Sequence, residues 1–351
     1  MIESGLHHTP VVRRREGVVA KAFPFTGLRK KVLILGDGRL ANNLARVLLG
    51  QRRNRYDILG FVTCDASNLG KQIVNPKVIG TLDRLFDLAE RERVDIVAVC
   101  FDEKRGTMPV ETLLDLKSLG VQVVDGYRLY EEECGRLPID ELRPSFLVFS
   151  SGFRRRPVAM AMKRAVDLVG SSCGLVLLAP LLMIIALLIK LDSPGPVLYR
   201  QTRVGMHGRP YTLLKFRSMR HDAEAEGVKW AAERDPRVTK VGYWLRKLRL
   251  DELPQFLNVL KGEMSLVGPR PERPQFVHEL REIIPYYDLR HTVRPGITGW
   301  AQTCFQYAAS IDDSHMKLQY DLYYVKNLSL SLDLKILLKT VKVVLLGVGA
   351  R

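Results

Sequence analysis

The sequence has few cysteines and none of the spacings that usually hold a structural metal. Five cysteines are spread over 351 residues, and no Cys-x-x-Cys pair occurs. The odd number argues against a disulfide framework and suits a reducing compartment. A zinc site is therefore not expected.

The N-terminal end lacks the apolar run of a secretory signal. Residues 1–28 instead predict a basic, disordered tail. The net charge is +16, but no nucleic-acid-binding motif or aromatic platform accompanies it. Nucleic acid is therefore not expected as a partner. The charge favours an anionic membrane face or phosphorylated substrates.

Residues 29–133 alternate short apolar strands with helical segments, for example a strand at 32–35 and a buried strand at 96–100. Strands that alternate with helices predict a doubly wound parallel sheet, and hence an α/β Rossmann-like domain. Residues 134–157 follow it as a linker or docking arm.

The first turn of this domain has a weak dinucleotide-binding pattern, Gly36-x-Gly38-x-x-Ala41. Its glycines would let a pyrophosphate approach a helix N-terminus, and Asp65 at the end of the second strand could meet a ribose hydroxyl. The alternative is a tight turn that needs glycine and holds no cofactor. Nothing else in the sequence indicates redox chemistry.

One uncharged stretch, Leu168–Ile189, is long enough to cross a bilayer, at about 33 Å as a straight helix. Pro180, which follows Ala179, should bend it. Basic residues flank both ends, and the positive-inside rule then places both ends on the cytoplasmic side. We expect a re-entrant helix-break-helix over 168–189. A kinked spanning helix and a buried helix are the alternatives.

Two adjacent acids, Asp251 and Glu252, interrupt an apolar segment. Pro254 predicts a helix that begins near Asp251 and runs to about Lys261, with Gly262 as its stop. At a helix N-terminus the acids could serve as a cap and dipole partner. Alternatively, an ionised carboxylate can attack phosphorus, or hold Mg²⁺ against phosphate oxygens.

Arginines surround these acids. Arg246, Arg249 and Arg270 are expected to keep the aspartate ionised and to attract a diphosphate. Arg270 and Gly268 share a rigid Gly-Pro-Arg-Pro turn, where a guanidinium could clamp a phosphate.

Two further motifs combine cations with turns and suit phosphates or lipid headgroups. "LLKFRSM" contains Lys215 and Arg217, and "VRPGITGWAQ" contains Arg294 and Trp300. The indole of Trp300 could stack on a base or sugar, or could belong to the core.

Collinear motifs over roughly Arg156 to Val344 resemble those of bacterial sugar transferases, the monotopic polyprenyl-phosphate phosphoglycosyl transferases. The quoted motifs include "LLKFRSM", "RKLRLDELPQFLNVLKGEMSLVGPRP", "VRPGITGWAQ" and "YDLYYVKNLSLSLDLKILLKT".

The resemblance implies transfer of a sugar phosphate from a UDP-sugar, bound with Mg²⁺, to polyprenyl phosphate. Asp251 would be the nucleophile that displaces UMP and holds the sugar phosphate covalently. Glu252 would assist in metal binding or proton handling, and Arg270 would hold phosphate. Lys215, Arg217 and Arg294 fall in matching basic motifs. The product would start the synthesis of an exopolysaccharide, capsule or other glycoconjugate.

The resemblance also implies a mainly α, membrane-associated catalytic domain over 158–351, on the cytoplasmic face of a bacterial inner membrane. The family often has Ser-Pro at the helix break, whereas Ala179-Pro180 keeps the proline and lacks the hydroxyl. Many large members carry spanning helices ahead of the Rossmann-like domain, and this sequence shows none. A homodimer could form through that domain.

Two other functions stay open. The Gly36 turn would suit an NAD-dependent nucleotide-sugar oxidoreductase, and the positive charge permits a non-catalytic, membrane-docked nucleotide sensor. In the C-terminal segment, Leu332, Ile336, Leu337 and Val341 fit a helix that is either interfacial or part of the core.

Overall fold

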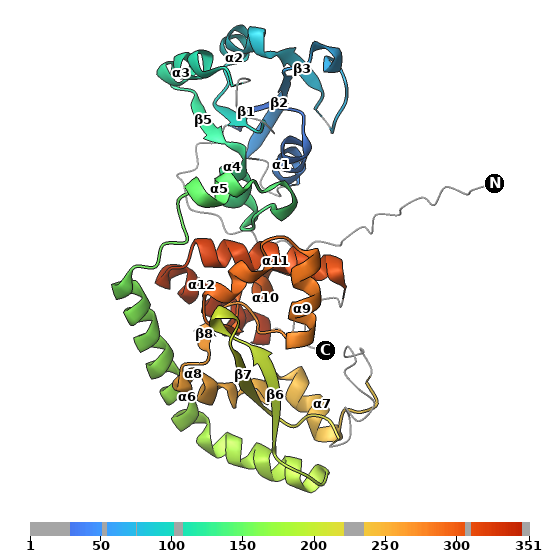
Figure 1. Ribbon diagram of the computed structural model, residues 1–351, viewed down its shortest axis with the longest axis vertical. Helices are drawn as coiled ribbons and strands as arrows, with labels where there is room; N and C mark the ends of the chain where they lie inside the picture. Colours follow the sequence, from blue (N-terminus) through green and yellow to red (C-terminus); the bar gives the residue numbers. More distant parts are fainter. Residues whose placement is uncertain are drawn as a thin grey trace, which may run out of the picture.

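The computed structural model shows an α/β domain above a larger, mainly helical domain (Figure 1). The predicted tail, 1–28, lies outside the described residues. The structure describes residues 29–50, 55–74, 76–101, 108–220, 235–305 and 310–345.

The first domain is built on a five-stranded sheet in the order β3-β2-β1-β4-β5. All four strand pairs are parallel, which confirms the predicted parallel α/β sheet. The strands are β1 (Lys30–Leu35), β2 (Tyr56–Thr63), β3 (Val78–Thr81), β4 (Ile96–Val99) and β5 (Gln122–Asp125).

Helices cover both faces of this sheet. Val32 and Ile34 of β1 pack in the cluster that contains residues of α1 and α4, whereas Leu33 and Leu35 pack with α2 and α3. Alternate residues of β1 thus pack into the cores on opposite faces of the sheet, as a sheet buried on both faces requires. The helices are α1 (Arg39–Leu49), α2 (Leu85–Glu92), α3 (Val110–Ser118) and α4 (Gly126–Cys134).

The segment 134–157 contains the turn η3 (Ile139–Glu141) and helix α5 (Pro144–Phe149). Its side chains Leu137 and Ile139 are buried in one core cluster with Leu318 of α11 (Ile311–Lys326). The amide of Leu137 also donates to the carbonyl of Gln319 at 3.1 Å. The segment therefore packs against both domains.

The second domain combines helices with two small sheets, which a mainly α domain was not expected to contain. β6 (Leu198–Val204) and β7 (Pro210–Phe216) form an antiparallel hairpin, and β8 (Ser265–Val267) pairs in parallel with β9 (Gly296–Thr298). The remaining helices are α6 (Pro157–Asp192), α7 (Lys240–Lys247), α8 (Gln255–Lys261), α9 (Pro274–Ile283), α10 (Trp300–Cys304) and α12 (Leu330–Leu345).

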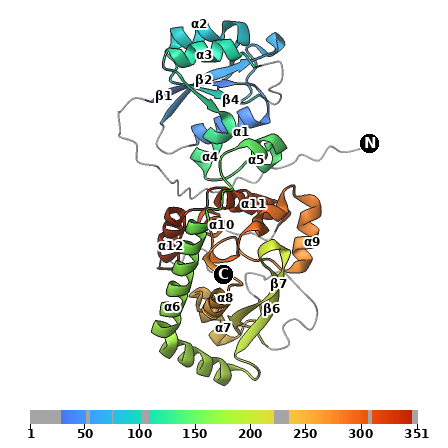
Figure 2. The same cartoon turned by 60° about the vertical axis from the view of Figure 1, so that its left-hand side comes forward.

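Helix α6 is continuous over 36 residues with Pro180 inside it. The predicted break at Ala179-Pro180 is thus a bend within one helix, as expected where a proline removes one hydrogen bond. Figures 1 and 2 show α6 descending beside the second domain and then turning beneath it. By length and apolar composition it could cross a membrane, and only 11% of its most apolar window is buried.

The charged residues at the start of α6 face the protein. Asp167 accepts from Ser265 Oγ and from the amide of Leu266, both at 3.0 Å. Lys163 donates to Asp333 Oδ2 of α12 at 2.7 Å, and both side chains are buried. Lys163 is one of the basic residues that precede the apolar segment. Lys163 and Asp167 fasten α6 to β8 and α12.

The last helix supports both sequence-based alternatives. Ile336 is fully buried, and Leu332 and Leu337 pack against the same core cluster. Leu338 and Val341 are exposed. One face of α12 therefore belongs to the core, and another presents apolar side chains at the surface.

We expect Lys163→Met to lower the free energy of unfolding by about 3 kcal/mol, because it leaves the Asp333 carboxylate buried without its cation. Chemical denaturation in detergent measures the change. Lys190→Met, at an exposed position of the same helix, is the control and should have little effect. Equal stabilities of the two variants would contradict a structural role for the pair.

Candidate active site

Asp251 and Glu252 lie in the turn η5 (Leu250–Glu252) ahead of α8. The α-helix was predicted to begin near Asp251. It begins instead at Gln255, with Pro254 at its N-cap. Gly262 ends the helix with φ +86, which confirms the predicted stop. The two carboxylates are therefore not caps of α8.

Asn258 of α8 fixes the β7 strand beside this turn. Its Oδ1 accepts from the amide of Leu214 at 3.0 Å, and its Nδ2 donates to the carbonyl of Thr212 at 2.7 Å. Asn258 is fully buried. The next residue of β7, Lys215, is thereby held close to the acid pair.

Glu252 joins two cations that arrive from distant parts of the chain. Its Oε1 accepts from Lys215 Nζ at 2.9 Å and from Arg270 Nη2 at 2.7 Å. The same Lys215 nitrogen lies 3.9 Å from Asp251 Oδ2. The structure thus brings together four of the predicted site residues, Asp251, Glu252, Lys215 and Arg270.

The pKa values of the two neighbouring carboxyls are shifted in opposite directions. Burial raises the pKa of Asp251; Lys215 opposes the rise, and the charge of Glu252 adds to it. Burial would also raise the pKa of Glu252, but Arg270 and Lys215 together lower it far below its ordinary value. Arg270 and Arg246 oppose the rise in the pKa of Asp251, as expected, but the direct partner of Arg270 is Glu252.

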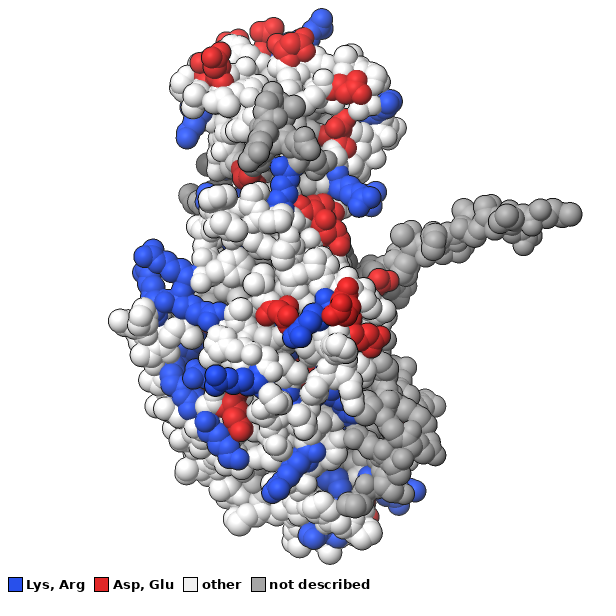
Figure 3. Space-filling view, in the orientation of Figure 1, with Lys and Arg blue, Asp and Glu red and all other residues white. Residues whose placement is uncertain are grey.

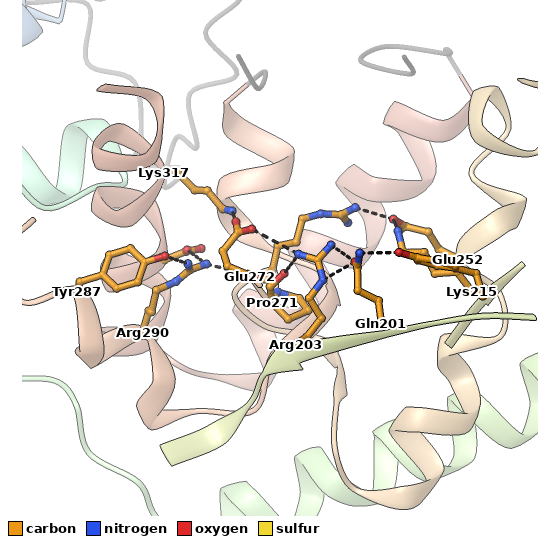
Figure 4. A network of polar contacts seen from close by, with 12 residues as sticks. Gln201, Arg203, Lys215, Glu252, Pro271, Glu272, Tyr287, Arg290 and Lys317 are labelled. Carbon is orange, nitrogen blue, oxygen red and sulfur yellow. Dashed lines mark hydrogen bonds and ion pairs between the residues drawn. The ribbon is translucent and has the colours of Figure 1, made fainter. Parts of the chain in front are cut away.

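A buried ion-pair network supports the loop that carries Arg270 (Figure 4). Arg290 donates to the carbonyl of Arg270 at 2.8 Å and to Tyr287 Oη at 2.7 Å. Its guanidinium lies 2.9 Å from Asp321 Oδ2, and both side chains are almost fully buried. The backbone at Arg270 is therefore tied to α11.

A second set of contacts holds the next two residues of this loop. Arg203 of β6 donates to the carbonyl of Pro271 at 3.0 Å, and its guanidinium lies 3.6 Å from Glu272. Glu272 also pairs with Lys317 of α11. Burial would raise the pKa of Glu272, but Lys317 and Arg290 lower it to about 2. Glu272 is therefore a buried anion that joins the loop to β6 and α11.

Sequence reasoning missed these supporting residues. One available signal was the acid that directly follows the Pro-Arg-Pro motif, Glu272. Another was the pair Lys317 and Asp321, which stand four residues apart and so share one face of a helix. Charges at core-facing positions need partners, so they point to an internal ion-pair network.

Arg217 does not join the acid pair, although it was expected to hold phosphate. It is 5% exposed and donates to the carbonyls of Ile189, Ser193 and Pro194. These carbonyls stand at the C-terminal end of α6 and just beyond it. Arg217 therefore caps α6, where helix carbonyls lack partners within the helix.

Gly268 and Arg294 also serve the backbone. A Cβ on Gly268 would lie 2.4 Å from the carbonyl oxygen of Arg294, so only glycine fits this crossing. The amide of Gly268 donates to the carbonyl of Thr298, and Arg294 Nε donates to the carbonyl of Gly262, both at 2.9 Å. The groups expected to meet phosphate are thus engaged within the protein.

Trp300 lies in the core and is 2% exposed. Its indole N–H donates to the carbonyl of Gly135 at 2.7 Å, and its ring stacks on Tyr323. Lys339 Nζ lies 4.3 Å from the ring centroid. These contacts support the core alternative over stacking on a base or sugar.

The glycine turn of the first domain also favours its structural alternative. A Cβ on Gly36 would lie 2.8 Å from the carbonyl oxygen of Cys100. The carboxylate of Asp37, between Gly36 and Gly38, accepts from Thr63 Oγ1 and Asn68 Nδ2. An anion in this turn would repel a pyrophosphate.

Asp65, which was expected to meet a ribose, caps a local turn. Its carboxylate accepts from the amide of Ser67 at 2.9 Å and from the Ser67 hydroxyl at 2.8 Å. The contacts begin η1 (Ala66–Asn68). They account for the side chain without a nucleotide.

Within the described ranges, no cluster of three or more His, Cys, Asp or Glu side chains is arranged to hold a metal. Asp251 and Glu252 supply two carboxylates. Mg²⁺ is commonly bound by one or two carboxylates together with substrate phosphates and water. The donor set therefore fits Mg²⁺.

Comparison with known proteins points to one family. A family model described as bacterial sugar transferase matches residues 158–347. A UDP-N-acetylgalactosamine-undecaprenyl-phosphate N-acetylgalactosaminephosphotransferase of Aeromonas hydrophila is 47% identical over 224 residues, which cover 64% of this chain and 52% of that protein.

Two further relatives match different lengths of the chain. An undecaprenyl-phosphate glucose phosphotransferase of Komagataeibacter xylinus is 37% identical over 348 residues, 95% of this chain and 60% of that protein. The exopolysaccharide production protein PSS of Rhizobium leguminosarum bv. phaseoli is 44% identical over 190 residues, 52% of this chain and 94% of that protein. The chain spans about half the length of several of its relatives.

We expect substitutions of the two acids to change stability in opposite directions at pH 7. Glu252 has a lowered pKa, so its charge stabilises the fold above its unfolded pKa, and this contribution is lost as the pH falls. Glu252→Gln should therefore cost about 2 kcal/mol at pH 7, with a smaller cost near pH 4. Asp251 has a raised pKa, so Asp251→Asn should increase stability at pH 7.

Denaturation at several pH values measures both changes. Asp312→Asn, at an exposed position, is the control. Equal destabilisation by the two active-site substitutions would contradict the opposite pKa shifts.

Proposed function

The chain belongs to the bacterial sugar transferase family, and we propose that it transfers a sugar 1-phosphate from a UDP-sugar to polyprenyl phosphate, with release of UMP. The observation that carries the proposal is the buried Asp251–Glu252 pair held by Lys215 and Arg270. Two relatives are named as undecaprenyl-phosphate sugar phosphotransferases, which supports polyprenyl phosphate as the second substrate.

Asp251 is the proposed nucleophile. An oxygen of its carboxylate attacks the phosphorus attached to the sugar, and the bond between that phosphorus and the bridging oxygen breaks. UMP leaves with the electron pair, and the sugar phosphate stays on Asp251. An oxygen of polyprenyl phosphate then attacks the same phosphorus. This step breaks the aspartyl bond, restores the carboxylate and yields a polyprenyl diphosphate sugar.

The charged groups at the site have different roles in this reaction. The raised pKa of Asp251 means that its anion is poorly stabilised in the resting site, which favours attack. Glu252 stays ionised and holds Lys215 and Arg270 in position for the diphosphate. Mg²⁺, held by the two carboxylates, would supply further neutralisation of phosphate charge.

Helix α6 would bring this site to the lipid acceptor. It packs closely on α8, since a Cβ on Gly174 would lie 3.1 Å from the Phe256 ring. Its remaining surface is apolar and exposed. We propose that α6 enters the cytoplasmic leaflet of a bacterial inner membrane and returns on the same side. Lys and Arg side chains along the α6 side of the second domain suit anionic headgroups (Figure 3).

An NAD-dependent oxidoreductase and a nucleotide sensor are less well supported. The oxidoreductase would rely on the Gly36 turn, where the Asp37 carboxylate would repel a pyrophosphate. The sensor rests on the positive charge of the chain alone. A homodimer through the first domain remains part of the proposal.

Asp251→Asn is expected to abolish sugar phosphate transfer to undecaprenyl phosphate in the presence of Mg²⁺, because an amide cannot form the acyl phosphate. UMP release across a panel of UDP-sugars measures the activity, and mass spectrometry of the protein without acceptor detects the adduct. Asp312→Asn should keep full activity. Full activity in Asp251→Asn would disprove the nucleophile.

Labelling of single cysteines tests the membrane path of α6. In a variant that lacks the natural cysteines, Val158→Cys and Leu191→Cys provide exposed sites near its two ends. In sealed vesicles of known orientation, both should react with an impermeant reagent added from the cytoplasmic side. Reaction from opposite sides would mean that α6 spans the membrane.

A further inference from the structure

A cavity of about 150 Å³ opens beside Glu252. It is far larger than the ~10–15 Å³ that one water needs. Its wall combines residues of η5, α8, β9, α10 and α12. Those that matter for recognition are Glu252, Phe256, Thr298, Gln302, Thr303 and Thr340.

The threonine hydroxyls in the wall donate their hydrogen bonds to acceptors within the protein. Thr340 Oγ1 donates to the carbonyl of Ile336 at 2.9 Å, so its 2.7 Å contact with Thr298 uses the proton of Thr298. Thr303 Oγ1 donates to the carbonyl of Trp300 at 3.0 Å. A hydroxyl has one proton and two lone pairs. Thr298 and Thr303 therefore meet a ligand as acceptors.

Gln302 adds an acceptor of another kind. Its Nε2 donates to the carbonyl of Ile297 at 3.2 Å, which fixes the amide. Its Oε1 is buried and has no hydrogen-bond partner among the described residues. A buried carbonyl oxygen without a donor is unfavourable, so a ligand N–H or O–H would stabilise this arrangement.

We infer that this cavity receives the sugar ring of the donor, and that Gln302 and Thr303 select the sugar. This inference rests on the function proposed above. Arg249 also lines the cavity and supplies donors, but Thr298, Thr303 and Gln302 offer acceptors. These acceptors fit a ligand with several hydroxyl donors, whereas an isoprenoid chain has none and a uracil ring has one N–H. The Phe256 ring gives the apolar face of a sugar a surface to lie on. Glu252 at the rim then places the sugar phosphate beside Asp251.

The test compares donors and variants. For the wild type, Gln302→Leu and Thr303→Val, kcat/KM is measured with the UDP derivatives of glucose, galactose, N-acetylglucosamine and N-acetylgalactosamine. The matched control is Thr292→Val, because Thr292 Oγ1 also donates to the carbonyl three residues earlier, at 2.7 Å, and does not line the cavity. UMP is tested as a product inhibitor of each variant.

Gln302→Leu should lower kcat/KM for the preferred donor about tenfold and reduce the preference among epimers. Thr303→Val should act in the same direction. UMP should inhibit all variants equally, because it carries no sugar, and Thr292→Val should match the wild type.

Three results would overturn the inference while the proposed function stands. These are unchanged donor preference in both cavity variants, a matching loss of UMP inhibition, and an increased KM for polyprenyl phosphate alone. Absence of turnover with every donor in the wild type would instead overturn the proposed function itself. Unchanged melting temperatures ensure that the variants are folded.

Discussion

The site depends on one carboxylate oxygen, Glu252 Oε1, which accepts from both Lys215 and Arg270. The two cations lie far apart in the sequence, on β7 and on the loop after β8. Their shared acceptor draws both segments against η5. Three charged groups in so little space are favourable only when each is paired, because burial penalises every unpaired charge. The arrangement therefore leaves Asp251 as the group whose charge is least satisfied.

Support for this centre comes from farther away. Asn258 sets the distance between α8 and β7, and Arg290 and Glu272 hold the Arg270 loop against α11. Buried polar groups of this kind fix geometry, since any displacement leaves them unpaired. Helix α6 is held in the same way by Lys163, Asp167 and Arg217. Many of the domain's cations are thus structural, although the net charge of the chain suggested ligand binding.

The sequence allowed the parallel sheet, the acid pair and the stop at Gly262 to be predicted, because each depends on local pattern or on a motif. Arg270 was expected beside the acids, whereas the contact of Lys215 with Glu252 was not. The sequence did not reveal which arginines face inward. Arg217 and Arg270 both stand in basic motifs, yet one caps a helix and the other meets Glu252. Trp300 likewise satisfied two interpretations until its neighbours were known. Such choices are decided by tertiary contacts between distant segments, which a single sequence does not display.

The contact between the Trp300 indole and the carbonyl of Gly135 has a consequence for dissecting the protein. Residues 134–149 complete the surface of the second domain: they satisfy a buried N–H and cover Leu318 and Leu322. A fragment that starts at α6 would lose both, and a solubilised catalytic unit must therefore keep this segment or replace it. The boundary for such a fragment therefore lies near the end of α4 and not at the start of α6.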